Sequence, residues 1–160
     1  MQLRVTKAKT PVGEIVAWST GEGVCALGWS DAREQLEGML EKRFGEYTEK
    51  GKDATLAKAL RKWVKGDPKA LHDVRVDVEG TKFQKKVWAR LRKIPVGETL
   101  SYAALAKMVG SSPRAVGNAN GQNPVSIIVP CHRVIGSDGS LTGYAYGTDR
   151  KAWLLEHEAS

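Results

Sequence analysis

The chain has 160 residues with 27% charged and 41% hydrophobic side chains, a composition that excludes a disordered protein. No apolar run approaches the roughly 20 residues of a membrane-spanning helix, and the N-terminus lacks the apolar core of a signal peptide. The two cysteines, Cys25 and Cys131, lie too far apart in sequence to suggest a disulfide framework, which favours the reducing cytoplasm. We interpret Cys25 as a small buried hydrophobic residue.

The first half of the chain predicts a scaffold. Alternating apolar and polar residues predict a short antiparallel meander with strands at 3–8, 13–18 and 23–29. Asp31 is expected to cap a helix to about Phe44, whose inward stripe is Leu36, Met39, Leu40 and Phe44. A second helix has the inward stripe Leu56, Leu60, Trp63 and Val64. No polar cluster converges here, so we interpret residues 1–78 as an α/β scaffold domain.

Residues 79–160 are expected to form a largely helical second domain. Thr81 and Gln84 have the spacing of a capping box, which starts a helix with the buried face Phe83, Val87, Trp88 and Leu91. Ser101 begins a short helix that Gly110 closes. Ser112 then precedes a proline at the first position of another helix, to about Gly121. Two short helices joined by a tight turn predict a helix-turn-helix.

The rest of this half predicts a wing and a last helix. The apolar stretch VSIIV at 125–129 predicts a strand, and a small hairpin is expected from residues 134–135 and 140–141. The last helix begins at Thr148 or Asp149 and carries Glu158 near its end. The predicted fold class is therefore α+β, with a small N-terminal sheet domain joined to a winged helix-turn-helix domain.

Charge is distributed unevenly between the two halves. Of the net +7, residues 1–78 carry +2 and residues 79–160 carry +5, so the second half has the stronger reason to bind a polyanion. In its second short helix, Ala115, Gly117 and Ala119 are small, which allows close approach to another helix or to the floor of a nucleic-acid groove.

The stretch VPCHRVIG at 129–136 predicts a reactive centre. Pro130 biases the preceding residue to extended geometry, so Cys131 is expected to leave the strand at a rigid exit. Neighbours in an extended chain point to opposite faces, so we expect a water to bridge Cys131 and His132. Glu158 is a candidate acceptor that would fix the tautomer of the imidazole. CxxC and HxxxH patterns are absent, so no metal and no other cofactor is expected.

PCHRVIG, preceded by RAVGNANGQNP and followed by GYAYGTDRKAWLLEHE, closely resembles the O6-alkylguanine-DNA alkyltransferases, the methylated-DNA–protein-cysteine methyltransferases. The resemblance is dense over residues 81–158 and includes TPVGEIVAW in the first half. It implies a monomeric repair protein that binds the minor groove of double-stranded DNA. It further implies a single irreversible transfer of the alkyl group from flipped O6-alkylguanine, and from O4-alkylthymine, to Cys131.

The resemblance also implies roles for individual residues. The implied catalytic set is Cys131 as acceptor, His132 acting through a water, Glu158 orienting the imidazole, Asn123 holding the turn and Tyr102 donating to the leaving guanine. Arg114 would fill the space of the flipped nucleotide, and the other implied DNA contacts are Tyr102, Ser112, Ala115, Gly117 and Asn118. The implied guanine pocket is lined by Pro130, Val134, Tyr144, Ala145 and Tyr146.

Two other functional classes stay open. A cysteine hydrolase using Cys131, His132 and Asn123 would turn over an acyl substrate without DNA. A non-catalytic winged-helix protein would bind alkylated DNA and leave Cys131 unmodified. If the resemblance holds, Tyr146 stands where many members have glycine, which predicts a narrower pocket that favours methyl over benzyl adducts.

Overall fold

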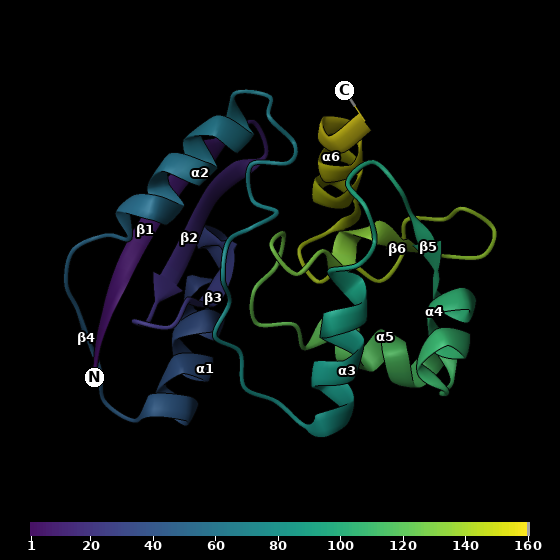
Figure 1. Cartoon of the computed structure of the whole chain (residues 1–160), viewed down its shortest axis with the longest axis horizontal. Helices are drawn as coiled ribbons and strands as arrows, with labels where there is room; N and C mark the ends of the chain where they lie inside the picture. Colours follow the sequence, from purple (N-terminus) through teal and green to yellow (C-terminus); the bar gives the residue numbers. More distant parts are fainter. Residues whose placement is uncertain (160) are drawn as a thin grey trace. The chain divides into compact units, whose positions relative to one another are not determined.

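The computed structural model describes residues 1–159, which form two compact units (Figure 1). The first unit holds Met1–Glu79 together with Pro124–Ile128, and the second holds Gly80–Asn123 and the chain from Val129 onward. A boundary after residue 78 alone would assign 124–128 to the second domain. The structure groups them with the first unit because the Leu27 N–H donates to the Pro124 carbonyl at 2.9 Å and the Ser126 N–H to the Leu27 carbonyl at 3.1 Å.

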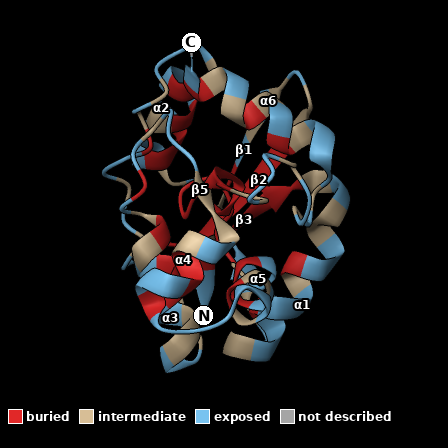
Figure 2. Ribbon diagram, turned by 90° about the vertical axis from the view of Figure 1, so that its right-hand side faces the viewer, coloured by how far each residue is buried: buried red, intermediate tan, exposed pale blue. Residues whose placement is uncertain are grey.

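The first unit is built on a four-stranded sheet in the order β3-β2-β1-β4. Its strands are β1 (Gln2–Thr10), β2 (Gly13–Ser19), β3 (Val24–Trp29) and β4 (Thr48–Glu49). The first three form the predicted antiparallel meander, which is confirmed, and β4 joins β1 in parallel. Figure 2 shows how strongly β2 and β3 are buried. The two exposed residues of β4 carry no apolar alternation, so sequence periodicity does not indicate this strand.

Two helices pack on this sheet. A 3₁₀ turn (Ser30–Ala32) leads into α1 (Arg33–Phe44), which contacts β3, and α2 (Ala54–Val64) contacts β1. The prediction that Asp31 caps α1 is wrong, because Asp31 lies inside the 3₁₀ turn and Ala32 occupies the cap position. Met39, expected to face inward, is 39% exposed, whereas Leu36 and Leu40 are buried in the core.

The second unit contains three helices that pack against one another: α3 (Lys82–Leu91), α4 (Tyr102–Val109) and α5 (Pro113–Gly121). The predicted capping box of α3 is present in full. Ser101 and Ser112 cap α4 and α5 as predicted, and Gly110 ends α4 in the left-handed region at φ 69°. Local hydrogen-bonding chemistry therefore sets the boundaries of these helices.

The remaining elements of the second unit include the turn that carries residue 131. They are β5 (Leu100–Ser101), a 3₁₀ turn η2 (Cys131–Arg133), β6 (Val134–Ile135) and α6 (Thr148–Ala159). The predicted hairpin is wrong, because β6 pairs in parallel with β5 and residues 140–141 form no strand. Residues 136–140 form a turn instead, in which the Gly136 N–H donates to the Ser140 carbonyl at 2.9 Å.

The stretch VSIIV is also not the predicted strand. It makes only an isolated bridge from Val125 to Leu27 and then turns at Ile127, whose φ is 73°. A β-branched residue in this region is a strained outlier that its surroundings must hold. No helix within residues 1–159 is long and apolar enough to cross a membrane.

Gly23 is a glycine that the fold requires. A Cβ built there would lie 2.7 Å from the Arg75 carbonyl oxygen, which already accepts a hydrogen bond from the Val24 N–H. We expect Gly23→Ala to lower the free energy of unfolding by about 1–3 kcal/mol in urea denaturation. The matched control is Gly21→Ala, since a Cβ at Gly21 meets no atom within 4 Å. Equal stability of the two variants would contradict this packing argument.

Candidate active site around Cys131

Cys131 lies in the η2 turn, not at the end of an extended strand as predicted. The Cys131 N–H donates to the Val129 carbonyl at 2.8 Å, and the Arg133 N–H donates to the Pro130 carbonyl at 3.0 Å. A 3₁₀ turn has about three residues per turn, so it spreads consecutive side chains in three directions. The thiol, the imidazole and the guanidinium of residues 131–133 therefore face different surroundings. Cys131 itself is 6% exposed.

His132 and Glu158 meet in the interior of the second unit. Both are buried, and Nε2 of His132 contacts Oε1 of Glu158. Arg133, which is not among the predicted site residues, donates from Nε to both carboxylate oxygens at 3.2 and 2.8 Å and from Nη1 to the Ile94 carbonyl at 2.7 Å. The carboxylate of α6 thus holds both residues that follow Cys131.

Burial and charge determine the protonation states of His132 and Glu158. Burial lowers the pKa of His132 and outweighs the raising effect of Glu158. Burial raises the pKa of Glu158, but hydrogen bonds and charge from His132 and Arg133 outweigh it, so that pKa is lowered. We therefore assign an ionised carboxylate and a neutral imidazole that donates its Nε2–H to the carboxylate. Nδ1 then carries the lone pair, and it has no hydrogen-bond partner among residues 1–159.

Two asparagines near the end of α5 hold the turn. Nδ2 of Asn123 donates to the Val129 carbonyl at 2.8 Å, and Nδ2 of Asn120 donates to the Cys131 carbonyl at 3.4 Å. A role in holding this part of the chain is expected for Asn123, whereas buried Asn120 is not among the predicted residues. Its three-residue spacing from Asn123 in NANGQNP is a signal that both side chains could reach the same segment.

Lys151 of α6 is a second residue that the sequence does not indicate. It is fully buried, and its Nζ donates to the Val134 carbonyl at 2.5 Å and to the Thr142 carbonyl at 3.1 Å. Burial lowers its pKa, whereas the negative charge of a Cys131 thiolate raises it. The same ammonium lies 5.7 Å from the centre of the Tyr102 ring. Lysine is rarely buried, so the residue type gives no sign of this buried position.

Tyr102 begins α4 and is half buried. Its hydroxyl donates to the Thr142 carbonyl at 3.4 Å, and burial raises its pKa, so the hydroxyl keeps its proton at neutral pH. Gly143 lies against it at φ 86°, where a Cβ would come 2.7 Å from the hydroxyl oxygen. The segment that follows places the rings of Tyr144 and Tyr146 5.8 Å apart, with Ala145 exposed between them. Of the other predicted pocket residues, Pro130 and Val134 are buried on either side of η2.

The predicted DNA-contacting residues lie on α5 and at its start. Ser112, Arg114 and Asn118 are exposed, and Ala115 and Gly117 are half buried. A Cβ added at Gly117 would meet no atom within 4 Å among residues 1–159. Packing inside the described chain therefore does not explain this glycine, which leaves room for close approach from outside. No group of three or more His, Cys, Asp or Glu side chains in residues 1–159 is placed to hold a metal ion.

Comparisons with known proteins point to one family. Residues 82–160 match the family described as "6-O-methylguanine DNA methyltransferase, DNA binding domain". The chain is 39% identical to a methylated-DNA–protein-cysteine methyltransferase of Salmonella typhimurium, covering 99% of this chain and 96% of that protein. A Methanosarcina acetivorans protein of the same name is 41% identical, covering 95% and 96% respectively.

A solved structure agrees in fold over the same extent. The crystal structure of Mycobacterium tuberculosis OGT in complex with DNA superposes with a TM-score of 0.81 at 35% identity, covering 99% of this chain and 93% of that one. Sequence identity above 30% over nearly the whole length of both chains indicates homology as well as a shared fold. The chain therefore belongs to the methylated-DNA–protein-cysteine methyltransferase family.

Proposed function

We propose that this chain repairs O6-alkylguanine in DNA by taking the alkyl group onto Cys131 in a single irreversible transfer. The observation that carries the proposal is the buried Glu158–His132 pair, which leaves the Nδ1 lone pair open on the residue next to the cysteine. A neutral imidazole in this tautomer accepts a proton, and a bridging water relays it from the thiol. The resulting thiolate is the nucleophile that the reaction needs.

The transfer is an in-line displacement at a saturated carbon. The sulfur–carbon bond forms as the bond between that carbon and guanine O6 breaks, and the electron pair leaves with the guanine. The proton of the thiol ends on His132, and the Tyr102 hydroxyl donates to the departing base. Developing charge on a leaving group is stabilised by such pre-positioned donors. The product is a thioether, which no water-derived step in the site reverses, so one molecule accepts one alkyl group.

Access to the lesion requires the base to leave the helix, at a cost of a few kcal/mol in unstacking. We propose that α4 and α5 act as a helix-turn-helix and that α5 enters the minor groove of double-stranded DNA, with Ser112 and Asn118 on the backbone. The room beside Gly117 supports this, since small residues such as Gly117 and Ala115 let the helix backbone approach the groove floor. Exposed Arg114, in the first turn of α5, would fill the space of the flipped nucleotide.

The flipped base would enter a pocket between η2 and residues 143–146. We propose that Pro130, Val134 and the Tyr144–Tyr146 segment line it, with the Ala145 N–H as donor to guanine. Tyr146 narrows the pocket and favours methyl over bulkier adducts. O4-alkylthymine presents the same alkyl–oxygen bond to the thiolate, and we propose it as a second substrate. We also propose that the protein acts as a monomer, since a single chain contains all of these residues.

The hydrolase alternative fits this arrangement less well. Such a mechanism needs the Asn123 amide to orient His132, but that amide donates to the Val129 carbonyl, and the imidazole Nε2 faces Glu158. The non-catalytic alternative would have the same fold. Only a test for alkyl transfer to Cys131 distinguishes it from the proposed repair function.

Intact-mass measurement after incubation with duplex DNA containing O6-methylguanine tests the proposal. We expect each molecule to gain the mass of one CH₂ group, mapped to Cys131, and Cys131→Ala to gain nothing while still binding DNA. Cys25→Ala is the matched control and should transfer normally, because Cys25 is buried in the first unit and burial raises its pKa to about 11. Tight binding without any mass gain would favour the non-catalytic alternative.

The pH dependence of transfer reports on His132. Because burial holds the pKa of His132 below its ordinary value of about 6.5, the base is mostly neutral at that pH. We expect the single-turnover rate at pH 6.5 to exceed half the rate at pH 7.5 and to be lost as the solution becomes more acidic. The free base O6-methylguanine is the substrate of choice, since it suits the narrow pocket proposed above and no DNA opening then limits the rate. A midpoint above pH 7 would contradict a neutral buried imidazole.

Glu158→Gln tests the positioning role of the carboxylate. The change leaves buried Arg133 without its ionic partner, so we expect the free energy of unfolding to fall by about 3–5 kcal/mol. Transfer by the folded fraction should also slow, because the tautomer of His132 is no longer fixed. Glu156→Gln, an exposed position on the same helix, should change stability by no more than about 0.5 kcal/mol. Equal stabilities in urea denaturation would show that the buried ion pair does not hold the turn.

A further inference from the structure

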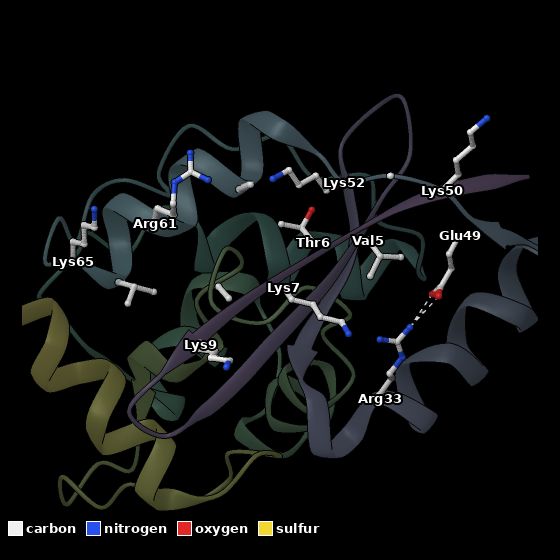
Figure 3. Close-up of a pocket in the computed structure, with 14 residues that line it drawn as sticks. Val5, Thr6, Lys7, Lys9, Arg33, Glu49, Lys50, Lys52, Arg61 and Lys65 are labelled. Carbon is white, nitrogen blue, oxygen red and sulfur yellow. Dashed lines mark hydrogen bonds and ion pairs between the residues drawn. The ribbon is translucent and has the colours of Figure 1, made fainter.

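The first unit carries a groove of about 650 Å³ between β1, residues 49–52 and α2 (Figure 3). It follows an edge of the sheet. β4 pairs only with the first two residues of β1, and the Val5 N–H then donates to the Gly51 carbonyl at 2.9 Å. Beyond that point the groove continues along β1 as far as Lys9, and the opposite wall is formed by α2 with Arg61 and by Lys65 at the C-cap of this helix.

The groove is strongly basic although its unit is almost neutral. Residues 1–78 contain fourteen basic and twelve acidic residues, and seven of the basic ones but a single acidic one line the groove. That acid, Glu49, accepts hydrogen bonds from Arg33 at 3.0 Å on both oxygens. The other six cations are all exposed and form no ion pair among residues 1–159: Lys7, Lys9, Lys50, Lys52, Arg61 and Lys65.

Protection of a sheet edge explains only part of this pattern. Lysines on an open edge prevent pairing with another strand, which accounts for Lys7 and Lys9 on β1. It does not account for Arg61 and Lys65, which reach the same groove from a helix, or for the lysines of the connecting segment. Like charges gathered from three segments repel one another, and an anion in the groove relieves that repulsion.

The other lining residues indicate which anion fits. They are small or aliphatic, namely Val5, Ala8, Gly51, Ala57 and Val64, and no aromatic ring is present. The hydroxyl of Thr6 accepts a hydrogen bond from the Asp53 N–H at 3.1 Å. Nothing in the groove is therefore suited to stack on a base or to read a base edge, whereas flexible ammonium groups and a guanidinium suit phosphate oxygens.

We propose that this groove is a second nucleic-acid-binding surface that holds phosphates of the DNA backbone without reading sequence. The inference rests on the proposed function only in that DNA is the polyanion this chain would encounter. Its residues belong to the first unit and include none of the proposed catalytic or DNA-contacting residues.

Two double variants in α2 and its C-cap make a matched test. Arg61→Ala with Lys65→Ala removes two groove cations, and Lys58→Ala with Lys62→Ala removes two equally exposed cations at the same spacing that do not line the groove. Binding to an undamaged duplex is measured across a salt series, and thermal unfolding checks that both variants are folded. The slope of log K against log salt should decrease by about 0.9 for each phosphate that the protein no longer neutralises.

We expect the slope of the groove variant to fall by nearly two and that of the control variant to change little. At low salt the groove variant should also bind roughly tenfold more weakly than the control, because two phosphates then keep their counterions. Superimposable salt series for the two variants would overturn the proposal.

Alkyl transfer from free O6-methylguanine separates this inference from the proposed function. The groove variant should react at the wild-type rate, since no DNA is involved. If wild-type protein accepts no alkyl group but the two variants still differ in DNA binding, the proposed function fails and the groove stands. If transfer is normal and both variants bind DNA like wild type, the groove fails and the proposed function stands.

The test also distinguishes a protein occupant. The same unit has an acidic hollow lined by Glu37, Glu41, Glu46 and Glu49, which a second copy could present to the groove. Sedimentation without DNA would then reveal a salt-sensitive association that is absent from the groove variant alone. That result, with unchanged DNA binding, would assign the groove to a second copy and overturn the nucleic-acid proposal.

Discussion

Glu158 is a buried carboxylate that receives hydrogen bonds from both residues that follow Cys131 in the chain. Burying a charge is costly unless it is paired and hydrogen-bonded, and here the partners come from a short turn that no sheet or long helix fixes in place. The guanidinium of Arg133 supplies the compensating charge, so the imidazole of His132 can stay neutral. One carboxylate therefore sets both the position of the turn and the tautomer of its histidine.

The backbone of this turn depends on side chains in a similar way. Residues 129–134 present several carbonyls outside any regular ladder, and a buried carbonyl needs a donor. Asn123 serves the Val129 carbonyl, Asn120 serves that of Cys131, and Lys151 serves that of Val134. The donors come from the end of α5 and from α6. The helices that carry the proposed DNA-contacting residues and Glu158 thus also hold the segment that carries the cysteine.

The sequence separation between a group and its hydrogen-bond partner decides which features can be predicted from the sequence. The ends of α3, α4 and α5 follow from caps within four residues, so nearby residues are enough to locate them. The path through Ile127 cannot be found in this way, because a β-branched run favours extended backbone, whereas Ile127 lies at φ 73° next to Ser126, which donates to distant Leu27. Asn120 and Lys151 escape prediction for the same reason, since their partners lie 11 and 17 residues away in the chain. Local rules predict helix ends, and they do not predict the donors of an irregular turn.

Net charge along the sequence is equally incomplete as a guide to polyanion binding. The first half carries only +2, which points to the second half, yet the fold separates the charges of the first half into a basic groove and an acidic hollow. Sequence spacing already groups these cations: Lys7 and Lys9 share one face of a strand, and Arg61 lies four residues before Lys65, the C-cap of α2. Neither pair of cations indicates polyanion binding by itself. The indication comes from the fold, which brings both pairs to one groove. A near-neutral domain can therefore present a stronger local field than its total charge suggests, because the field depends on where charges converge.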